Sequence, residues 1–216
     1  RKEDGRIDGT ARGIPTARGI RRKAPIPPYP SALRSRPEDI APLLADCDHV
    51  TERAMQWLEW RTPSDSVLDI ALENLTLARA ALYRAVLSAD YPNDAAPTEP
   101  LSALTAKISE AVDGLREAGR ADHLPHGLLT RAWYRALTDD MPGARFDLDE
   151  AWGIAERGPM PLFQADILLT RARLFFSADR EQAKRDLDAA RCLIMEKHHY
   201  HRRDGELDDA GAIIHE

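Results

Sequence analysis

The pentapeptide Leu-Leu-Thr-Arg-Ala occurs twice in this chain of 216 residues, at 128–132 and again at 168–172. An Ala-x3-Leu-x2-Ala pattern follows each copy, beginning at Ala144 and at Ala183. The two pentapeptides are 40 residues apart and the two later patterns are 39 residues apart. A chance duplication of five residues would not carry a second pattern with it at nearly the same offset. The repetition is therefore structural.

Each repeated pattern places small or apolar residues on one face of a helix, because positions i, i+4 and i+7 form a single stripe. A related stripe begins at Leu104 and a weaker one at Cys47, and the phrase LTLARA at 75–80 is related to the pentapeptide. The repeating unit is a helical hairpin of about 40 residues, which occurs roughly three times with partial copies at the ends. Such a period is typical of an α-solenoid, in which each hairpin buries its apolar face against the next.

Capping and helix-breaking residues divide the chain into seven or eight helices. Ser35-x-x-Glu38 and Asp179-x-x-Gln182 have the spacing of capping boxes, and 91–100 combines Pro, Asn and Asp without periodicity, which indicates a loop. The sequence contains no competing strand pattern, so we predict an all-α protein. The expected helices cover 35–60, 64–89, 101–119, 122–138, 140–158, 161–178, 179–198 and, as a short final element, 205–214.

Charge is unevenly distributed along the chain. The net charge is -6, yet residues 1–36 carry +7 and the remainder carries -13. Residues 1–34 are also rich in Gly and Pro and lack an apolar period, so we predict a disordered basic tail or linker there and one helical domain over 35–216. A basic arm can contact nucleic acid, which gives an alternative function. The acidic remainder disfavours that alternative.

No catalytic or cofactor-binding signature is present in the sequence. The phosphate-binding GxxxxGK[ST] loop and the HExxH, CxxC and GxSxG motifs are all absent, so we expect neither enzyme activity nor a cofactor. We interpret the histidines at 198, 199 and 201 as a basic helix end and not as a metal site. Cys47 and Cys192 are expected to be reduced, and no segment has the apolar length of a membrane span, so a cytoplasmic protein without a membrane partner is predicted.

Longer phrases carry a resemblance to a known family. AVDGLREAGRADHLPHGLLTRAWYRALTDD at 111–140, with 52–85, 148–174 and 200–207, resembles the C-terminal tetratricopeptide-like region of bacterial signal-transduction NTPases of the STAND/NACHT type. The resemblance implies a right-handed α-solenoid of tetratricopeptide-like hairpins that senses a ligand or protein partner. It also implies an upstream NTPase domain, which would have to be a separate domain or chain because the phosphate-binding loop is missing here.

The candidate binding residues come from the repeat and from this resemblance. Arg79, Arg131 and Arg171 occupy the same position of the aligned phrases, so stacking would place them in a row. Either they bridge to acids on neighbouring helices, or they form a ladder that binds an acidic peptide or a phosphate-bearing ligand. His126 stands where the resemblance leads us to expect Arg. Trp133 is either an interface anchor or a residue that fills a gap between helices.

Overall fold

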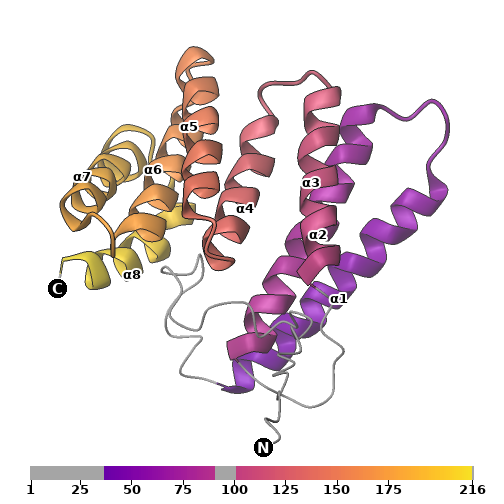
Figure 1. The fold of residues 1–216 in the computed structure, drawn as a ribbon, viewed down its shortest axis with the longest axis horizontal. Helices are drawn as coiled ribbons and strands as arrows, with labels where there is room; N and C mark the ends of the chain where they lie inside the picture. The colour runs from indigo at the N-terminus through magenta and orange to yellow at the C-terminus, as the bar shows by residue number, and fades with distance from the viewer. Residues whose placement is uncertain (1–36, 91–100, 216) are drawn as a thin grey trace, which may run out of the picture.

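The computed structural model describes residues 37–90 and 101–215 of the chain. The predicted tail at 1–34, the residue Ser35 and the predicted loop at 91–100 lie outside these residues. Within the described part the chain is all-α, as predicted, with eight α-helices and no strand (Figure 1). The helices are α1 (Pro37–Trp60), α2 (Val67–Asp90), α3 (Leu101–Glu117), α4 (Leu124–Leu137), α5 (Met141–Arg157), α6 (Pro161–Phe175), α7 (Arg180–Arg191) and α8 (Asp204–Ile214).

The helices pack mostly as consecutive pairs. α1 packs on α2, α2 on α3, α4 on α5 and α6 on α7, and Figure 1 shows these pairs side by side from α1 at one end to α8 at the other. Contacts between pairs also join α2 to α4 and α4 to α6. None of the helices in 37–90 and 101–215 combines the length and apolar character that a membrane span requires.

The stripes predicted from the repeat form the centre of the core. On α3, α5 and α7 every residue of the stripe has at most 2% of its surface exposed. These residues are Leu104, Ile108, Ala111, Ala144, Leu148, Ala151, Ala183, Leu187 and Ala190. The small alanines let a neighbouring helix approach closely, while the central Leu or Ile fills the space between. In the weaker copy on α1, Ala54 is buried but Cys47 and Thr51 are half-buried. Cys47 and Cys192 are both free thiols.

Side-chain caps begin the helices where the sequence predicts them. The Asp140 carboxylate accepts a hydrogen bond from the Gly143 amide, and the Asp179 carboxylate accepts one from the Gln182 amide, each at 2.9 Å. The α2 helix begins at Val67 and not at the expected Ser64, and it is capped by Ser66, whose hydroxyl accepts a hydrogen bond from the Asp69 amide at 3.1 Å. These bonds satisfy backbone donors that have no partner inside the helix.

The seventh helix departs from its predicted form at its carboxyl end. We expected one helix up to His198, but α7 ends at Arg191 and continues as a π-helical segment, Cys192–Lys197. His199 then adopts a left-handed backbone with φ of 51°, and the Tyr200 amide donates to the Ile194 carbonyl at 2.8 Å. The chain passes through a short 3-10 turn, His201–Arg203, into α8, which packs back on α6 and α7. This reversal positions the residues described next.

Candidate functional site

A pocket of about 330 Å³ lies where α2, α4 and α6 meet the segment 200–206. We call it the arginine pocket, because four of its lining residues are arginines. It is lined by Arg79, Tyr83, His126, Leu129, Thr130, Trp133, Asp166, Leu169, Thr170, Arg173, Leu174, Tyr200, Arg202, Arg203 and Glu206.

The lining of this pocket follows from the repeat. Four pairs of lining residues occupy matching positions of α4 and α6, 40 residues apart: His126 and Asp166, Leu129 and Leu169, Thr130 and Thr170, and Trp133 and Arg173. In each helix they lie on one face, while the first Leu and the Ala of the pentapeptide are buried and do not line the pocket. The repeat therefore places side chains of different chemistry at equivalent points around one cavity.

Two carboxylates of the pocket are engaged by two of its arginines. Arg203 Nε donates to Asp166 Oδ1 at 2.9 Å, and Arg203 Nη1 donates to Glu206 Oε1 at 2.5 Å. Glu206 Oε2 also accepts from Arg173 Nη1 at 2.7 Å. Burial lowers the pKa of Arg173 to about 10, so its guanidinium is still charged at pH 7. These contacts join α6 to the start of α8 and leave two arginines of the lining to account for.

Arg79 and Arg202 have no carboxylate partner among the described residues. The Arg79 guanidinium is half-buried, and burial is the main cause that lowers its pKa. Its Nε donates to Thr130 Oγ1 at 2.9 Å and its Nη2 to the His126 carbonyl at 3.0 Å, so it is held on α4 by neutral acceptors. Arg202 is exposed. The lining thus contains four arginines against two carboxylates, an excess of positive charge.

Trp133 brings an unused hydrogen-bond donor to the same lining. Only 7% of the residue is exposed, and its indole Nε1–H is buried without a hydrogen-bond partner in the described part of the chain. Its ring lies against that of Tyr83, with the centroids 5.1 Å apart. A buried donor without a partner costs free energy.

His126 is neutral at physiological pH. Burial, together with the positive charges of Arg79 and other nearby cations, lowers its pKa from 6.5 to about 4. Its ring meets that of Phe163 edge-on, with the centroids 4.6 Å apart. His126 therefore contributes to the pocket as an aromatic, uncharged wall and through its backbone carbonyl.

The lowered pKa of His126 predicts a loss of stability in mild acid. Between about pH 6.5 and pH 4 the unfolded chain binds a proton at this position and the folded chain does not, so the free energy of unfolding falls as the pH is lowered. Partial exposure limits the effect to about 1–2 kcal/mol. Denaturant unfolding at a series of pH values should show a shallower fall for His126→Gln than for the wild type. Identical slopes would contradict the prediction.

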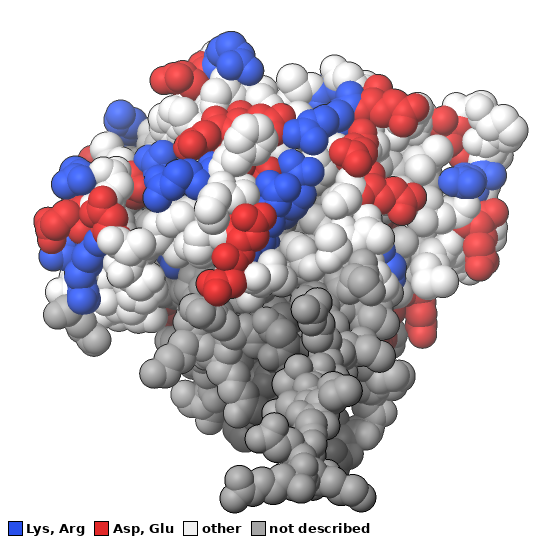
Figure 2. All heavy atoms as spheres, in the orientation of Figure 1, with Lys and Arg blue, Asp and Glu red and all other residues white. Residues whose placement is uncertain are grey.

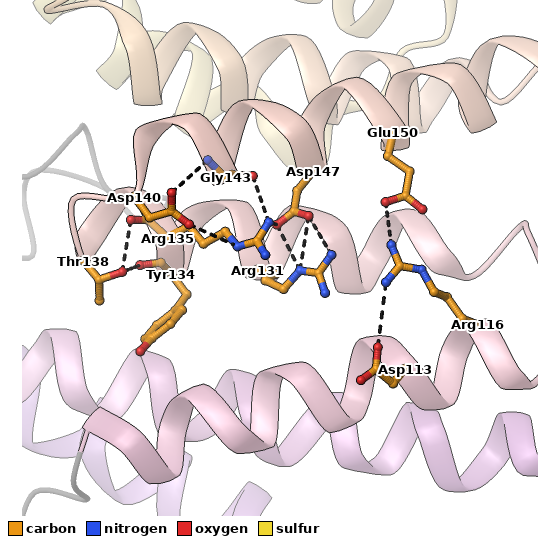
Figure 3. A network of polar contacts seen from close by, with 10 residues as sticks. All are labelled: Asp113, Arg116, Arg131, Tyr134, Arg135, Thr138, Asp140, Gly143, Asp147 and Glu150. Carbon is orange, nitrogen blue, oxygen red and sulfur yellow. Dashed lines mark hydrogen bonds and ion pairs between the residues drawn. The ribbon is translucent and has the colours of Figure 1, made fainter.

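Arg131 and Arg171 lie outside the pocket lining and are paired with buried acids. Arg131 donates from Nη2 to Asp147 Oδ1 at 2.7 Å and from Nε to both carboxylate oxygens, and Asp147 is fully buried (Figure 3). Arg171 makes the same two-pronged contact with Asp186, with both bonds at 2.6 Å. The interpretation in which arginines bridge to acids on neighbouring helices therefore holds for these two residues.

The three arginines of the expected row make different contacts. Arg131 and Arg171 bind an aspartate that directly precedes the central Leu of the next helix, whereas α3 has Lys107 at that position of its stripe. Arg79 consequently has no such acid on α3 and contacts α4 instead. Of the five candidate residues, the structure brings Arg79, His126 and Trp133 together in one pocket and leaves Arg131 and Arg171 between paired helices.

Several site residues were not foreseen from the sequence. Glu110 of α3 and Glu150 of α5 occupy matching positions of the repeat, but Glu110 is exposed. Glu150 pairs with Arg116 of α3 at 2.6 Å (Figure 3). The acids that pair with Arg131 and Arg171 could have been found from the triplet Asp-Leu-Asp, which occurs at 147–149 and 186–188 within the repeated stripes. Arg203 lies beyond the last repeat, where no periodic pattern could have predicted its place in the pocket.

The described residues contain no group of three or more His, Cys, Asp or Glu that could hold a metal ion. The rings of His199 and His201 stack with centroids 6.0 Å apart, and His201 Nδ1 lies 3.0 Å from an Asp204 oxygen.

The threonine hydroxyls of the pocket form hydrogen bonds within their own helices. Thr130 and Thr170 donate to backbone carbonyls one turn earlier, at 2.9 and 2.7 Å.

The arginine pocket combines charged and aromatic lining. The guanidinium of Arg79 and the rings of Trp133, Tyr83 and Tyr200 surround one cavity. Figure 2 shows Lys and Arg interspersed with Asp and Glu over the described helices on one face of the molecule, without a broad surface of one sign. Comparisons with protein-family models, with curated proteins and with solved structures find no match.

Proposed function

We propose that this chain is a non-catalytic binding module, a right-handed α-solenoid of tetratricopeptide-like hairpins whose arginine pocket receives a carboxylate of a protein or peptide partner. The observation that carries the proposal is Arg79, a half-buried guanidinium in the pocket without a carboxylate partner among the described residues. Charges in such surroundings are normally paired, so an anionic ligand is the expected complement. The sequence resemblance adds that such binding would regulate an NTPase domain located elsewhere.

The donors in the pocket favour a carboxylate as the recognised group. Arginine presents planar, paired donors that match the two oxygens of a carboxylate. Arg79 keeps its Nη1 free of the described residues, and Trp133 adds a neutral N–H in the same lining. Asp166 and Glu206 are already bound by Arg203 and Arg173, so they do not compete for Arg79.

A paired peptide library tests the proposal. Fluorescently labelled dodecapeptides that each contain one Glu among neutral residues are compared with counterparts in which that Glu is Gln, using the full chain and fluorescence anisotropy. We expect some Glu peptides to bind at least tenfold more tightly than their Gln counterparts, because the carboxylate gains a charge-assisted hydrogen bond. Arg79→Gln should remove this difference, and Arg84→Gln should not, since Arg84 is on α2 but pairs with Asp48 outside the pocket.

Arg79→Lys is a second variant in case Arg79→Gln does not fold. It keeps the positive charge but loses the planar pair of donors, so it should retain part of the preference for Glu peptides over Gln peptides. The proposal is wrong if no Glu peptide is preferred, or if the preference survives Arg79→Gln in a folded protein. Salt-dependent binding of a labelled DNA duplex, with no Arg79-dependent peptide, would instead support the nucleic-acid alternative and its basic segment 1–36.

A further inference from the structure

A second cavity borders α2 beside the arginine pocket. This groove of about 430 Å³ runs between α1 and α2, and we call it the α1–α2 groove. It is lined by Leu43, Asp46, Cys47, Val50, Thr76, Arg79, Ala80, Tyr83 and Leu87. Most of these side chains are apolar, and the charged ones are Asp46, which is exposed on α1, and Arg79. Its character is therefore the opposite of the arginine pocket.

The two cavities share a wall. Arg79 and Tyr83 line both of them, one turn apart on the same face of α2. The guanidinium of Arg79 reaches α4 on the pocket side, and the ring of Tyr83 packs on Trp133 there, while the apolar part of each side chain also borders the groove. A ligand long enough to cross these two side chains would meet an apolar surface first and a cationic pocket next.

The groove is a surface feature and not an enclosed channel. Val50 has 42% of its surface exposed, and Leu43 and Thr76 are half-buried. A fatty acyl chain in such a groove would remain partly in water along its length. A peptide suits it better, because apolar side chains can face the groove while the peptide backbone stays hydrated.

We propose that the arginine pocket and the α1–α2 groove form one binding site for a peptide in which apolar residues lie next to an acidic residue. The acidic side chain enters the arginine pocket at Arg79, and the adjacent apolar side chains fill the groove beside Val50. This inference rests on the proposed function and adds the sequence character of the partner. Charge complementarity sets the order, because Arg79 is at the junction and Asp46 repels a second acid in the groove.

Four peptide sets measure the two halves of the site separately. Each dodecapeptide has Glu or Gln at one position and, beside it, either three apolar residues or three serines. With the full chain in anisotropy titrations, we expect the Glu and apolar set to bind about tenfold more tightly than the Glu and serine set. Val50→Gln should weaken the apolar set about fivefold and leave the serine set unchanged. Met55→Gln is the matched control, since Met55 is 51% exposed on α1 but does not line the groove.

The outcomes separate this inference from the function on which it rests. Equal affinity for the apolar and serine sets, or equal behaviour of Val50→Gln and Met55→Gln, would overturn the two-part site even if the Glu preference still depends on Arg79. Loss of the Glu preference itself would overturn the proposed function as well. Val50 is substantially exposed, so its replacement by Gln is not expected to unfold the protein, and circular dichroism of each variant checks this.

Discussion

Replacing Asp147 with alanine is expected to lower the free energy of unfolding by about 3–5 kcal/mol. Asp147 is fully buried, accepts hydrogen bonds from Arg131, the shortest at 2.7 Å, and forms an ion pair with Arg135 at 2.8 Å. Without it, Arg131 loses its counter-ion, and Arg135 keeps only its longer contact with Asp140 at 3.5 Å. The Arg135 side chain is 28% exposed and can turn to water, but that of Arg131 is 11% exposed and cannot do so without disturbing the helix pair.

Asp149 provides the matched control for this prediction. It follows Asp147 by two residues in α5 and is exposed, so Asp149→Ala should change the free energy of unfolding by no more than about 0.5 kcal/mol. Urea unfolding monitored by circular dichroism measures both variants under the same conditions. If Asp147→Ala and Asp149→Ala differ by less than about 1 kcal/mol, the buried pair does not stabilise the fold as its geometry indicates.

The second large effect is expected at the centre of the repeated stripe. Leu148→Ala should lower the free energy of unfolding by about 3 kcal/mol, because it removes buried methyl groups and leaves a cavity that the surrounding helices fill only in part. Leu148 is 1% exposed between Ala144 and Ala151, both of which are fully buried. Alanine side chains are too short to move into the vacated space, so the cavity is expected to persist.

Leu162→Ala makes the same chemical change at a position that is 44% exposed, and it should cost less than about 1 kcal/mol. The comparison separates the effect of the cavity from that of losing leucine as such. Denaturant midpoints and slopes are measured for both variants, since an unchanged slope shows that the unfolded ensemble is the same. Equal destabilisation at the two positions would show that the stripe is not the centre of the core.

The positions of the helices could be predicted closely because their signals are local. Asp140 and Asp179 cap the helices that they were expected to begin, and the repeated stripes are buried. The π-helical segment Cys192–Lys197 could not be predicted, because its sequence has ordinary helical residues and contains neither Gly nor Pro. Its geometry results from how the chain must turn to pack α8 on α6, which is a tertiary requirement.

The candidate site was predictable only in part, for a related reason. Arg79, His126 and Trp133, which were singled out from the sequence, line one pocket, but alignment of the repeated phrases treated Arg79 as equivalent to Arg131. The direction of each arginine depends on the partner available. Asp147 holds Arg131 against α5, whereas α3 has Lys107 at the corresponding place and offers Arg79 no carboxylate there. A single helix position can thus face a neighbouring helix in one unit and a cavity in another.

Packing between consecutive helices has a consequence for how the chain unfolds. A molecule whose contacts join mostly sequence neighbours is close to one-dimensional, and its ends can melt before its middle. The arginine pocket joins helices that are not consecutive, since Arg79 of α2 donates to α4 and Arg203 donates to Asp166 on α6. A ligand that grips α2 and the segment 200–206 at once would tie the first pair of helices to the last, so that fraying at either end would require its release. With the ligand bound, thermal unfolding of the described helices would then occur in a single sharp transition.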